Sequence, residues 1–408
     1  MSYDVSAVRA HFPALAEGAA HFDGPGGSQV PDVVGAAVAG VLTAAVANRG
    51  TVTAAERRAE ECVTGFRSAM ADLLGATPRG IVHGRSMTAL TYDVSRALAA
   101  TWAPGDEVVV TRLDHDANIR PWVQAATRAG AEVRWVDVDP ADGELTADAL
   151  VAVLSERTRL VAFTAGSNLI GTMPDIPALT AAVHAAGALA YVDGVHATAH
   201  VPVDLQALGA DFYVCSPYKL MGPHCGVLAA DPALLDTLHP DKLLPATDEV
   251  PERLELGTLP YEVLAGCTAM VDFVASLGAL TGAAPPAPGA TRRERVVASM
   301  AAVEEYEDGL RERIEAGLGG IPGLTLYSRA ARRTPTLLVT SDRVDAQTLR
   351  LRLATDGVNA PAGSFYAIEP SRRLGLGDAG GLRIGLAPYS DAEDVDRLLR
   401  SLARAARS

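Results

Sequence analysis

Short strand-like segments alternate with longer helical ones between residues 86 and 230, and this alternation constrains the fold more than any other feature. Strand-like runs rich in β-branched residues occupy residues 107–111, 133–139, 159–164, 188–193, 211–216 and 226–230. Residues 117–129 and 175–186 have a helical pattern, and Asp175 is placed to cap the second helix. Strands separated by helices of this length predict an α/β fold with a large, doubly wound, mostly parallel sheet.

A proline- and glycine-rich stretch at residues 282–290 marks the clearest domain boundary, because such a stretch cannot continue a helix. A chain of 408 residues is also too long for one ordinary domain. We expect a large domain over residues 15–281, a linker over 282–295, and a small α+β domain over 296–408. Residues 1–14 are expected to pack on the small domain. Its expected elements are helices at 294–318, from 346 and at 392–405, and strands at 336–340 and 382–386.

The charge balance excludes several classes of partner. The formal net charge is −14, which argues against binding to nucleic acid or to an anionic membrane. The uncharged stretch at residues 33–47 is too short for a membrane span, which needs about 20 residues. Its small apolar residues instead predict a tightly packed interior or interface helix.

The four cysteines, Cys62, Cys215, Cys225 and Cys267, show neither a CxxC pair nor the spacing of zinc ligands. We therefore expect reduced thiols, no metal site and a cytoplasmic location. The first fifteen residues mix charges and lack the apolar core of a signal peptide, which agrees with that location.

Lysine is rare in this chain, and its rarity singles out one position. Of 35 basic residues other than histidine only Lys219 and Lys242 are lysines. Unlike arginine, a desolvated lysine can form a Schiff base. Lys219 follows one predicted strand and Asp193 ends another. A lysine for an aldehyde and a carboxylate for a pyridinium are what pyridoxal phosphate (PLP) requires of a protein. The alternative, an incidental surface lysine, fits Lys242 better.

Further polar residues follow strands or lie in apolar surroundings. Each is a candidate for the site, and each also has an ordinary structural explanation. Ser86 opens a helix whose first N–H groups suit a phosphate, or it is an ordinary helix cap. His115 stacks on a planar cofactor or is a loop residue, and Asn168 often simply forms a turn. His196 lies three residues after Asp193. Arg383, in an apolar run, suits a bidentate grip on a carboxylate or a buried salt bridge.

The joint order of these residues resembles a known family, the fold-type I, class V PLP-dependent enzymes, and within it the cysteine desulfurase-like branch. The resemblance runs nearly end to end. It is clearest at residues 22–27 (FDGPGG), 113–118 (LDHDAN), 167–172 (SNLIGT), 191–194 (YVDG), 216–219 (SPYK), 222–224 (GPH) and 257–258 (GT).

The resemblance implies a role for each matching residue. Lys219 would form the Schiff base and then move protons, Asp193 would pair with the pyridine nitrogen, and His115 would stack on the ring. Near the cofactor's phenolic oxygen would lie Asn168 and His196, the latter at a position where desulfurases usually have glutamine. Ser86, the Met87 backbone and Ser216 would hold the phosphate. Gly257 and Thr258 would reach the phosphate in a neighbouring subunit, which makes the protein a homodimer with shared active sites. Arg383 would bind the α-carboxylate of an amino-acid substrate.

The departures from the family pattern concern the reaction. True desulfurases carry a cysteine on a late loop that accepts sulfur as a persulfide. Tyr366, within residues 363–367, stands at that place, and no cysteine follows Cys267. The residues after Thr258 also differ from the Gln-Asn-His of close relatives, which implies an altered substrate pocket.

We therefore expect a PLP-dependent enzyme that cleaves the C–S bond of cysteine or an S-substituted cysteine by β-elimination, giving a thiol, pyruvate and ammonia. Related enzymes act in sulfur-containing antibiotic pathways, and the alanine- and arginine-rich composition fits the high-GC bacteria in which these are common. Three alternatives stay open. They are a decarboxylating oxidative deaminase or aminotransferase on an S-conjugated cysteine, a cysteine desulfurase that uses an unexpected thiol, and a non-catalytic partner protein of the same fold.

Overall fold

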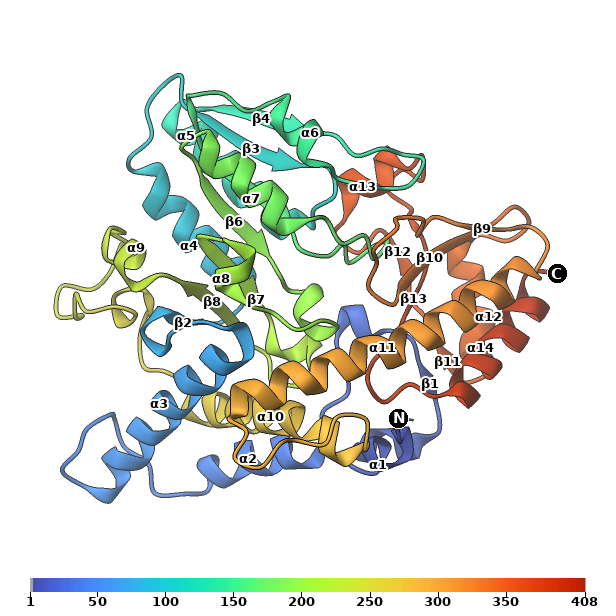
Figure 1. Ribbon diagram of the computed structural model, residues 1–408, viewed down its shortest axis with the longest axis horizontal. Coiled ribbons are helices and arrows are strands. Elements are labelled where there is room, and N and C mark those ends of the chain that lie inside the picture. Colours follow the sequence, from blue (N-terminus) through green and yellow to red (C-terminus); the bar gives the residue numbers. More distant parts are fainter. Residues whose placement is uncertain (1–2, 408) are drawn as a thin grey trace.

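A seven-stranded sheet with strand order β2-β8-β7-β6-β5-β3-β4 forms the centre of the molecule (Figure 1). The computed structural model describes residues 3–407. All strands run parallel except β8, which is antiparallel to both of its neighbours. The strands are β2 (Ile81–Gly84), β3 (Glu107–Thr111), β4 (Glu132–Val136), β5 (Thr158–Thr164), β6 (Leu189–Asp193), β7 (Phe212–Cys215) and β8 (Gly226–Ala230). The predicted mostly parallel α/β sheet is therefore confirmed.

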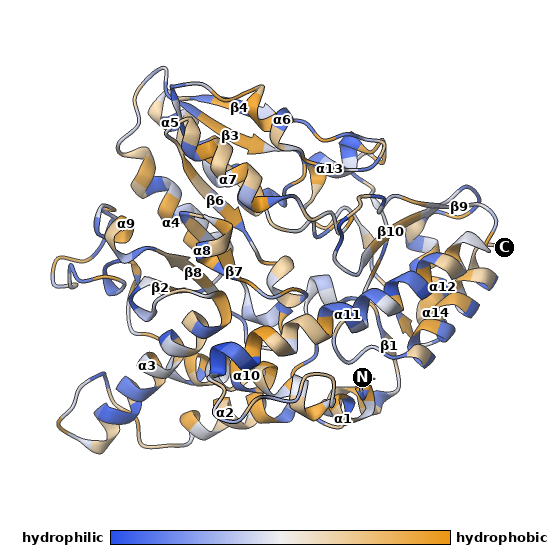
Figure 2. Ribbon diagram, viewed as in Figure 1, coloured by the Kyte–Doolittle hydropathy of each residue, from blue (hydrophilic) through white to orange (hydrophobic). Residues whose placement is uncertain are grey.

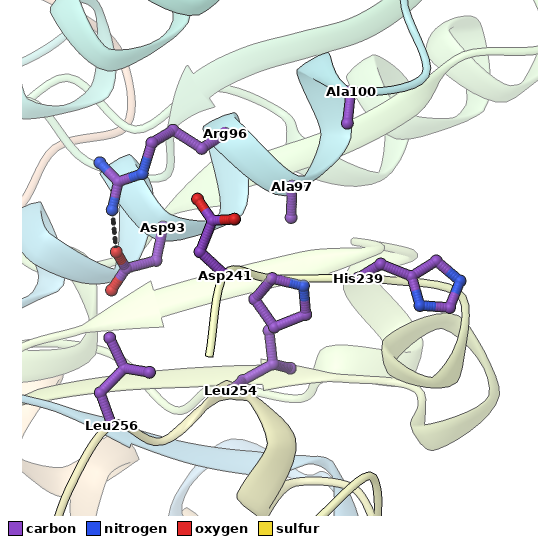
Figure 3. Close-up of a pocket in the computed structure, with 9 residues that line it drawn as sticks. Asp93, Arg96, Ala97, Ala100, His239, Asp241, Leu254 and Leu256 are labelled. Carbon is purple, nitrogen blue, oxygen red and sulfur yellow. Dashed lines mark hydrogen bonds and ion pairs between the residues drawn. The ribbon is translucent and has the colours of Figure 1, made fainter. Parts of the chain in front are cut away.

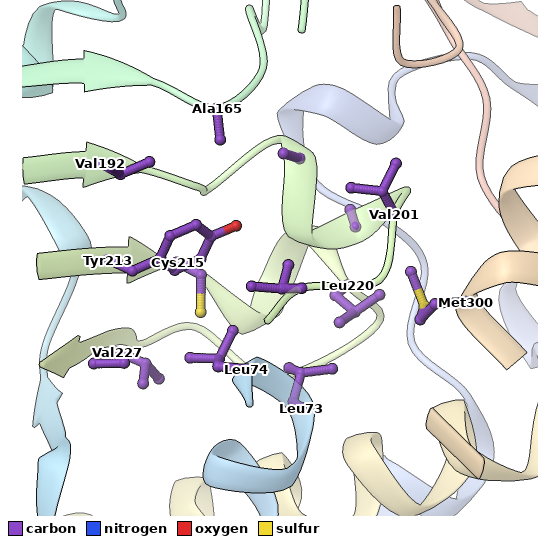
Figure 4. Close-up of a cluster of buried hydrophobic side chains, with 14 of the residues drawn as sticks. Leu73, Leu74, Ala165, Val192, Val201, Tyr213, Cys215, Leu220, Val227 and Met300 are labelled. Carbon is purple, nitrogen blue, oxygen red and sulfur yellow. The ribbon is translucent and has the colours of Figure 1, made fainter. Parts of the chain in front are cut away.

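Alternate residues of each strand enter separate apolar cores on the two faces of this sheet. In β3, Val109 joins one core, whereas Val108 and Val110 join the other. Figure 4 shows part of the first core, where Tyr213 and Cys215 lie near Leu73 and Leu74. The strands are coloured mainly as hydrophobic in Figure 2, as expected for strands covered on both faces.

Helices cover both faces of the sheet. On one face lie α4 (Met87–Ala99) and α5 (Arg120–Ala129), which contribute residues such as Leu90 and Trp122 to the second core. The first core takes in residues of α3 (Ala54–Leu74), α7 (Ile176–Ala185) and α10 (Tyr261–Leu280). Shorter helices are α1 (Val5–Arg9), α6 (Ala147–Val151), α8 (Leu205–Leu208) and α9 (Pro232–Asp236). By length and composition α10 could cross a membrane, but 56% of its most apolar window is buried within the protein. We read it as a core helix.

A smaller antiparallel sheet lies beside the large one, with order β12-β13-β10-β9. Its strands are β9 (Leu324–Leu326), β10 (Thr336–Ser341), β12 (Ala362–Gly363) and β13 (Gly381–Gly385). The helices of this part are α12 (Ala346–Thr355), α13 (Ile368–Arg373) and α14 (Ala392–Ala405), and a two-stranded parallel sheet pairs β1 (Ala20–His21) with β11 (Val358–Asn359). All of these elements except α13 contribute to a third apolar core.

One long helix, α11 (Arg292–Gly319), connects the two parts (Figure 1). Val296 and Met300 near its start join a core of the large sheet, whereas Leu310 and Ile314 join the core of the small one. The first residues also contact both parts, since Val8 packs in a large-sheet core and Arg9 pairs with Asp394 of α14. The domain boundary at residues 282–295 therefore remains a prediction. In the structure, the change from one core to the other occurs within α11.

The helix expected over the apolar stretch at residues 33–47 differs from the prediction. It forms α2 (Asp32–Leu42), which packs on α10 but ends five residues earlier than the stretch. Within α2 only Val34 is buried, and Leu42 is 66% exposed. Of the two predicted alternatives, the interior helix is wrong, because α10 covers a single side of this helix, and the interface helix stays a prediction.

Candidate active site

The predicted site residues meet at one edge of the large sheet. Parallel strands present their carboxyl ends together, and in such sheets ligands bind beyond those ends. Each of β2, β3, β5, β6 and β7 is followed at this edge by a polar residue. An inner cavity there is lined by Met87, Thr88, His115, Thr164, Gly166, Asn168, Asp193, Val195, His196, Ser216, Tyr218 and Lys219.

Asp193 is a buried carboxylate that lacks a cation. It is 4% exposed, and its Oδ1 accepts a hydrogen bond of 2.9 Å from the backbone N–H of Val195. Within residues 3–407 no lysine, arginine or histidine forms an ion pair with it. Burial raises the pKa of Asp193 to about 6, against the lowering effects of the Val195 N–H and of Lys219. A protonated ring nitrogen in the cavity would provide the missing positive charge.

Lys219 enters the same cavity from the short 3₁₀ turn Pro217–Lys219. Its Nζ lies 5.9 Å from the ring centre of Tyr218. Burial, and secondly the charge of Arg383, lower the pKa of Lys219 to about 8, with Asp193 opposing. Lys242, by contrast, donates to the Ala246 carbonyl and pairs with Asp248. An amine that loses its proton near neutral pH is suited to attack an aldehyde.

The turn before α4 presents unpaired N–H groups to the cavity. Ser86 caps the helix through its Oγ, which accepts from the N–H of Ala89 at 3.1 Å. In the part of the chain that the structure describes, the N–H groups of Met87 and Thr88 have no acceptor, as is usual in a first helical turn. A Cβ on Gly226 would lie 2.3 Å from the Met87 nitrogen, so only glycine allows β8 to approach this turn. The arrangement suits a phosphate.

Two neutral histidines flank the cavity. Burial lowers the pKa of His115 to about 3, with smaller effects of Lys219 and Arg383. Its Nδ1 accepts from the N–H of Ala117 at 3.0 Å, which leaves the hydrogen on Nε2. His196 is 2% exposed, and burial, followed by His200, lowers its pKa well below the usual value.

An outer cavity of about 610 Å³ continues from the inner one and is lined by both parts of the molecule. Arg383 of β13 reaches it, with its guanidinium 3.7 Å from the ring centre of Phe365 and its Nη1 donating to the Asn168 carbonyl at 3.0 Å. Burial lowers the pKa of Arg383 to about 9, so it stays cationic at neutral pH. An arginine held in this way suits a carboxylate of the substrate.

Tyr366 is 75% exposed and lines the outer cavity, with its ring centre 5.5 Å from that of His115. Phe365 and Tyr366 have φ angles of 54° and 58°, a left-handed conformation that side chains rarely adopt. Two hydrogen bonds hold this turn, from Asn168 Nδ2 to the Phe365 carbonyl and from the Asp116 N–H to the Tyr366 carbonyl.

Some predicted residues lie elsewhere, and some contributors were not predicted. Gly257 and Thr258 are exposed and line neither cavity of this chain. The sequence interpretation missed Thr88, Tyr218 and Phe365, whose side chains carry no chemical signal in the sequence. It also missed a network in which Glu369 of α13 pairs with Arg112 and Arg120 beside the outer cavity.

Comparison with known proteins decides the family. The aminotransferase class-V family matches residues 20–284 and 295–398, which is most of the chain. The chain belongs to the class V aminotransferase family. It is 33% identical to an uncharacterized protein of Mycobacterium tuberculosis (strain CDC 1551 / Oshkosh) over 99% of both chains. A cysteine desulfurase of Klebsiella pneumoniae is 31% identical over 99% of this chain and 98% of its own.

A solved structure agrees with this class V assignment. The cysteine desulfurase CsdA of Escherichia coli matches with a TM-score of 0.86 and 26% identity, over 100% of this chain and 99% of that one. The predicted fold-type I, cysteine desulfurase-like resemblance is confirmed. The protein is accordingly a PLP-dependent enzyme of the cysteine desulfurase and aminotransferase type.

The residues present fit PLP. The uncompensated carboxylate of Asp193 matches a pyridinium, the Lys219 amine with its lowered pKa matches an aldehyde, and the N–H groups of the α4 turn match a phosphate. His115, Asn168, His196 and Ser216 line the same cavity and complete the set that would surround the ring.

Proposed function

We propose that this enzyme cleaves the C–S bond of an S-substituted cysteine by β-elimination. The bond from Cα to its hydrogen and the bond from Cβ to sulfur both break. Sulfur leaves with the electron pair of the C–S bond and takes up a proton to become a thiol. Addition of one water to the remaining three-carbon unit releases pyruvate and ammonium, with no oxidant or reductant required.

The observation that carries this proposal is the absence of a thiol from the site. Tyr366 occupies the loop position at which a desulfurase has its sulfur-accepting cysteine, and none of the four cysteines lines either cavity. Cys215, Cys225 and Cys267 are buried, and Cys215 lies in an apolar core (Figure 4). A phenol cannot take sulfur as a persulfide, so sulfur is expected to leave as a thiol.

The outer cavity supports an S-substituted substrate rather than free cysteine. Its volume of about 610 Å³, part of which PLP would take because the inner cavity holds only about 50 Å³, is in the range of pockets for drug-sized ligands and exceeds the needs of a CH₂–SH group. Tyr92, Pro121, Phe365 and Tyr366 give part of its wall an apolar or aromatic surface.

The side chains have separate tasks in this proposal. Arg383 would bind the α-carboxylate, and stacking on Phe365 keeps its guanidinium in place. Lys219, with its pKa near 8, would remove the proton from Cα. PLP, when bound, supplies the electron sink for the electrons left at Cα. Asp193 would keep the ring nitrogen protonated, which makes that sink effective.

A panel of cysteine S-conjugates tests the reaction. The proposal predicts equimolar thiol and pyruvate. Alanine with protein-bound sulfur would indicate a desulfurase, CO₂ a decarboxylating deaminase, and a keto acid that retains sulfur an aminotransferase. No turnover of any conjugate by the PLP-loaded protein would contradict the proposed reaction.

We also propose a cytoplasmic homodimer that acts in the biosynthesis of a sulfur-containing natural product. Gly257 and Thr258 lie on a surface that also exposes Leu243, Leu244 and Leu256, at 71%, 99% and 62%. A neighbouring cavity of about 240 Å³, shown in Figure 3, is lined by Leu256 and by Asp93 and Arg96 of α4. The exposed side of α2 adds further apolar surface. In the dimer that the family resemblance implies, a second copy covers these residues and Thr258 reaches its partner's phosphate turn.

A further inference from the structure

His196 joins the cofactor cavity to the small sheet. Its Nε2 lies 2.9 Å from Thr334 Oγ1 and 3.0 Å from Thr336 Oγ1. Its Nδ1 is buried and has no hydrogen-bond partner within residues 3–407, while the residue lines the inner cavity. Because the imidazole is neutral, it carries one hydrogen, and that hydrogen is on either Nε2 or Nδ1.

The two threonine hydroxyls distinguish these states. Thr334 Oγ1 has a second partner, the Gly171 carbonyl at 3.4 Å, to which it donates. For the hydroxyl hydrogen of Thr336, the described residues offer no acceptor except His196 Nε2. If Nε2 carried the hydrogen, the buried Thr336 hydroxyl would have no acceptor for its own, at a cost of roughly 1–3 kcal/mol. A bare Nε2 accepts from Thr336 and satisfies both hydroxyls, and the hydrogen then lies on Nδ1 of a residue that lines the cavity, where water or PLP can accept it.

Backbone contacts hold the threonines in place. The N–H of Thr334 donates to the Gly171 carbonyl at 2.9 Å, and the N–H of Met173 donates to the Arg332 carbonyl at 2.9 Å. Gly171 has a φ of +78°, and a Cβ there would lie 2.7 Å from the Thr336 carbonyl oxygen. The small-sheet strand is therefore in close contact with the loop that carries Asn168, and the hydroxyls cannot easily turn away from His196.

We propose that Thr336 is a positioning residue that fixes His196 with its hydrogen on Nδ1, so that the small sheet supplies a hydrogen-bond donor to the cofactor cavity. The PLP ring oxygen beside the aldehyde carbon is the acceptor that this donor suits. The proposal does not depend on which substrate bond the enzyme cleaves, so it can fail independently of the elimination reaction.

The imidazole ¹⁵N shifts of the PLP-free protein, labelled with ¹⁵N-histidine, measure the tautomer directly. His196→Gln identifies the signals by their loss. We expect a protonated Nδ1 and a bare Nε2 in the wild type and in Thr336→Ser, which keeps the hydroxyl. In Thr336→Val, Nε2 loses its donor, and the hydrogen is expected to move to Nε2, where Thr334 can accept it. Thr334→Val is the matched control and should keep the wild-type pattern.

A protonated Nε2 in the wild type would overturn the proposal, and so would an unchanged tautomer in Thr336→Val. If the valine variant fails to fold, the ¹⁵N shifts of the wild type and of Thr336→Ser still show which nitrogen of His196 carries the hydrogen. In the PLP-loaded protein, the visible absorption band is expected to move in Thr336→Val and to stay in place in Thr336→Ser and Thr334→Val. A purely structural role for Thr336 would leave the band unmoved.

Discussion

The lowered pKa of Lys219 leads to a prediction about cofactor capture. The neutral amine attacks the aldehyde, and its fraction rises with pH through the pKa. The rate of PLP uptake by the PLP-free protein should therefore rise through about pH 8 and level off above it. Removing the positive charge with Arg383→Gln should move this midpoint upward. Stopped-flow absorbance measures the rate, and an increase that continues towards the ordinary lysine pKa of 10.5 would show that Lys219 is unperturbed.

Chemical labelling provides the control for this assignment. Borohydride reduction of the PLP-loaded protein should fix the cofactor to the peptide that contains Lys219, and Lys242→Ala should not affect it. No label is expected on Lys242, because its amine already contacts the Ala246 carbonyl and Asp248. Recovery of the label on Lys242 would therefore contradict the assignment.

Arg383 makes contacts that lysine cannot reproduce. Its planar guanidinium stacks on Phe365 and bonds Asn168 while further N–H groups remain available. We expect Arg383→Lys to weaken substrate binding by about 2 kcal/mol or more, roughly 30-fold, with PLP content unchanged. Titration of the PLP-loaded protein with amino-acid substrates measures this change. Equal affinity in the two proteins would assign the carboxylate to another residue.

At the residue scale, the sequence predicted which polar side chains would meet because parallel strands end at one edge. Asp193, Lys219, His115 and Asn168 all follow such strands and line one cavity. The hydroxyl partners of His196 could not be predicted in this way. Thr334 and Thr336 lie about 140 residues later in the chain, and only the packing of the small sheet brings them near.

Among the elements, α13 gives the clearest test. Glu369 Oε2 lies 2.5 Å from Arg112 Nη1, and its Oε1 lies 3.0 Å from Arg120 Nη2. The helix α13 directly follows the turn that carries Tyr366. Glu369→Gln should lower the free energy of unfolding by about 1–2 kcal/mol, a modest loss because both arginines are partly exposed. It should also raise the KM for the substrate more than it changes kcat.

Arg372→Gln on the same helix is the matched control for this test. Arg372 pairs with Asp378 on the surface, so no measurable change in stability or KM is expected. Urea unfolding and steady-state kinetics check both variants. Equal effects of the two substitutions would show that the Glu369 network does not support the site.

Local signals predicted elements well where they were strong. Asp175 caps α7 as expected, and β3 and α14 have the predicted bounds. The direction of β8 could not be predicted, because strand composition carries no information about parallel or antiparallel pairing. The sequence left open whether α2 lies in the interior or at an interface for a related reason, since an apolar helix has the same sequence pattern whether its own chain or another covers it.

At the scale of the whole molecule, the proposed dimer predicts complementation between two inactive variants. Lys219→Ala and Thr258→Arg would each inactivate both sites of their own homodimer. A hybrid dimer, with one subunit of each variant, has one site in which both residues are wild type. Refolding equal amounts together should restore roughly a quarter of wild-type activity, since half of the dimers are hybrids with one intact site. Full activity of a species that light scattering shows to be monomeric would contradict this account.

The most direct test of the central claim, elimination without a cysteine nucleophile, concerns Cys225. The contact with Cys267, 3.5 Å between the two sulfur atoms, lowers the pKa of Cys225 against the opposing effect of burial, whereas burial raises the pKa of the other three thiols. The test compares wild type, Cys225→Ala and the control Cys267→Ala, each loaded with PLP, and measures the pyruvate, thiol and alanine formed from a cysteine S-conjugate. The account predicts equimolar pyruvate and thiol at similar rates in all three. A folded, PLP-loaded Cys225→Ala that releases no sulfur, beside a wild type that forms alanine, would contradict elimination and favour a relocated persulfide.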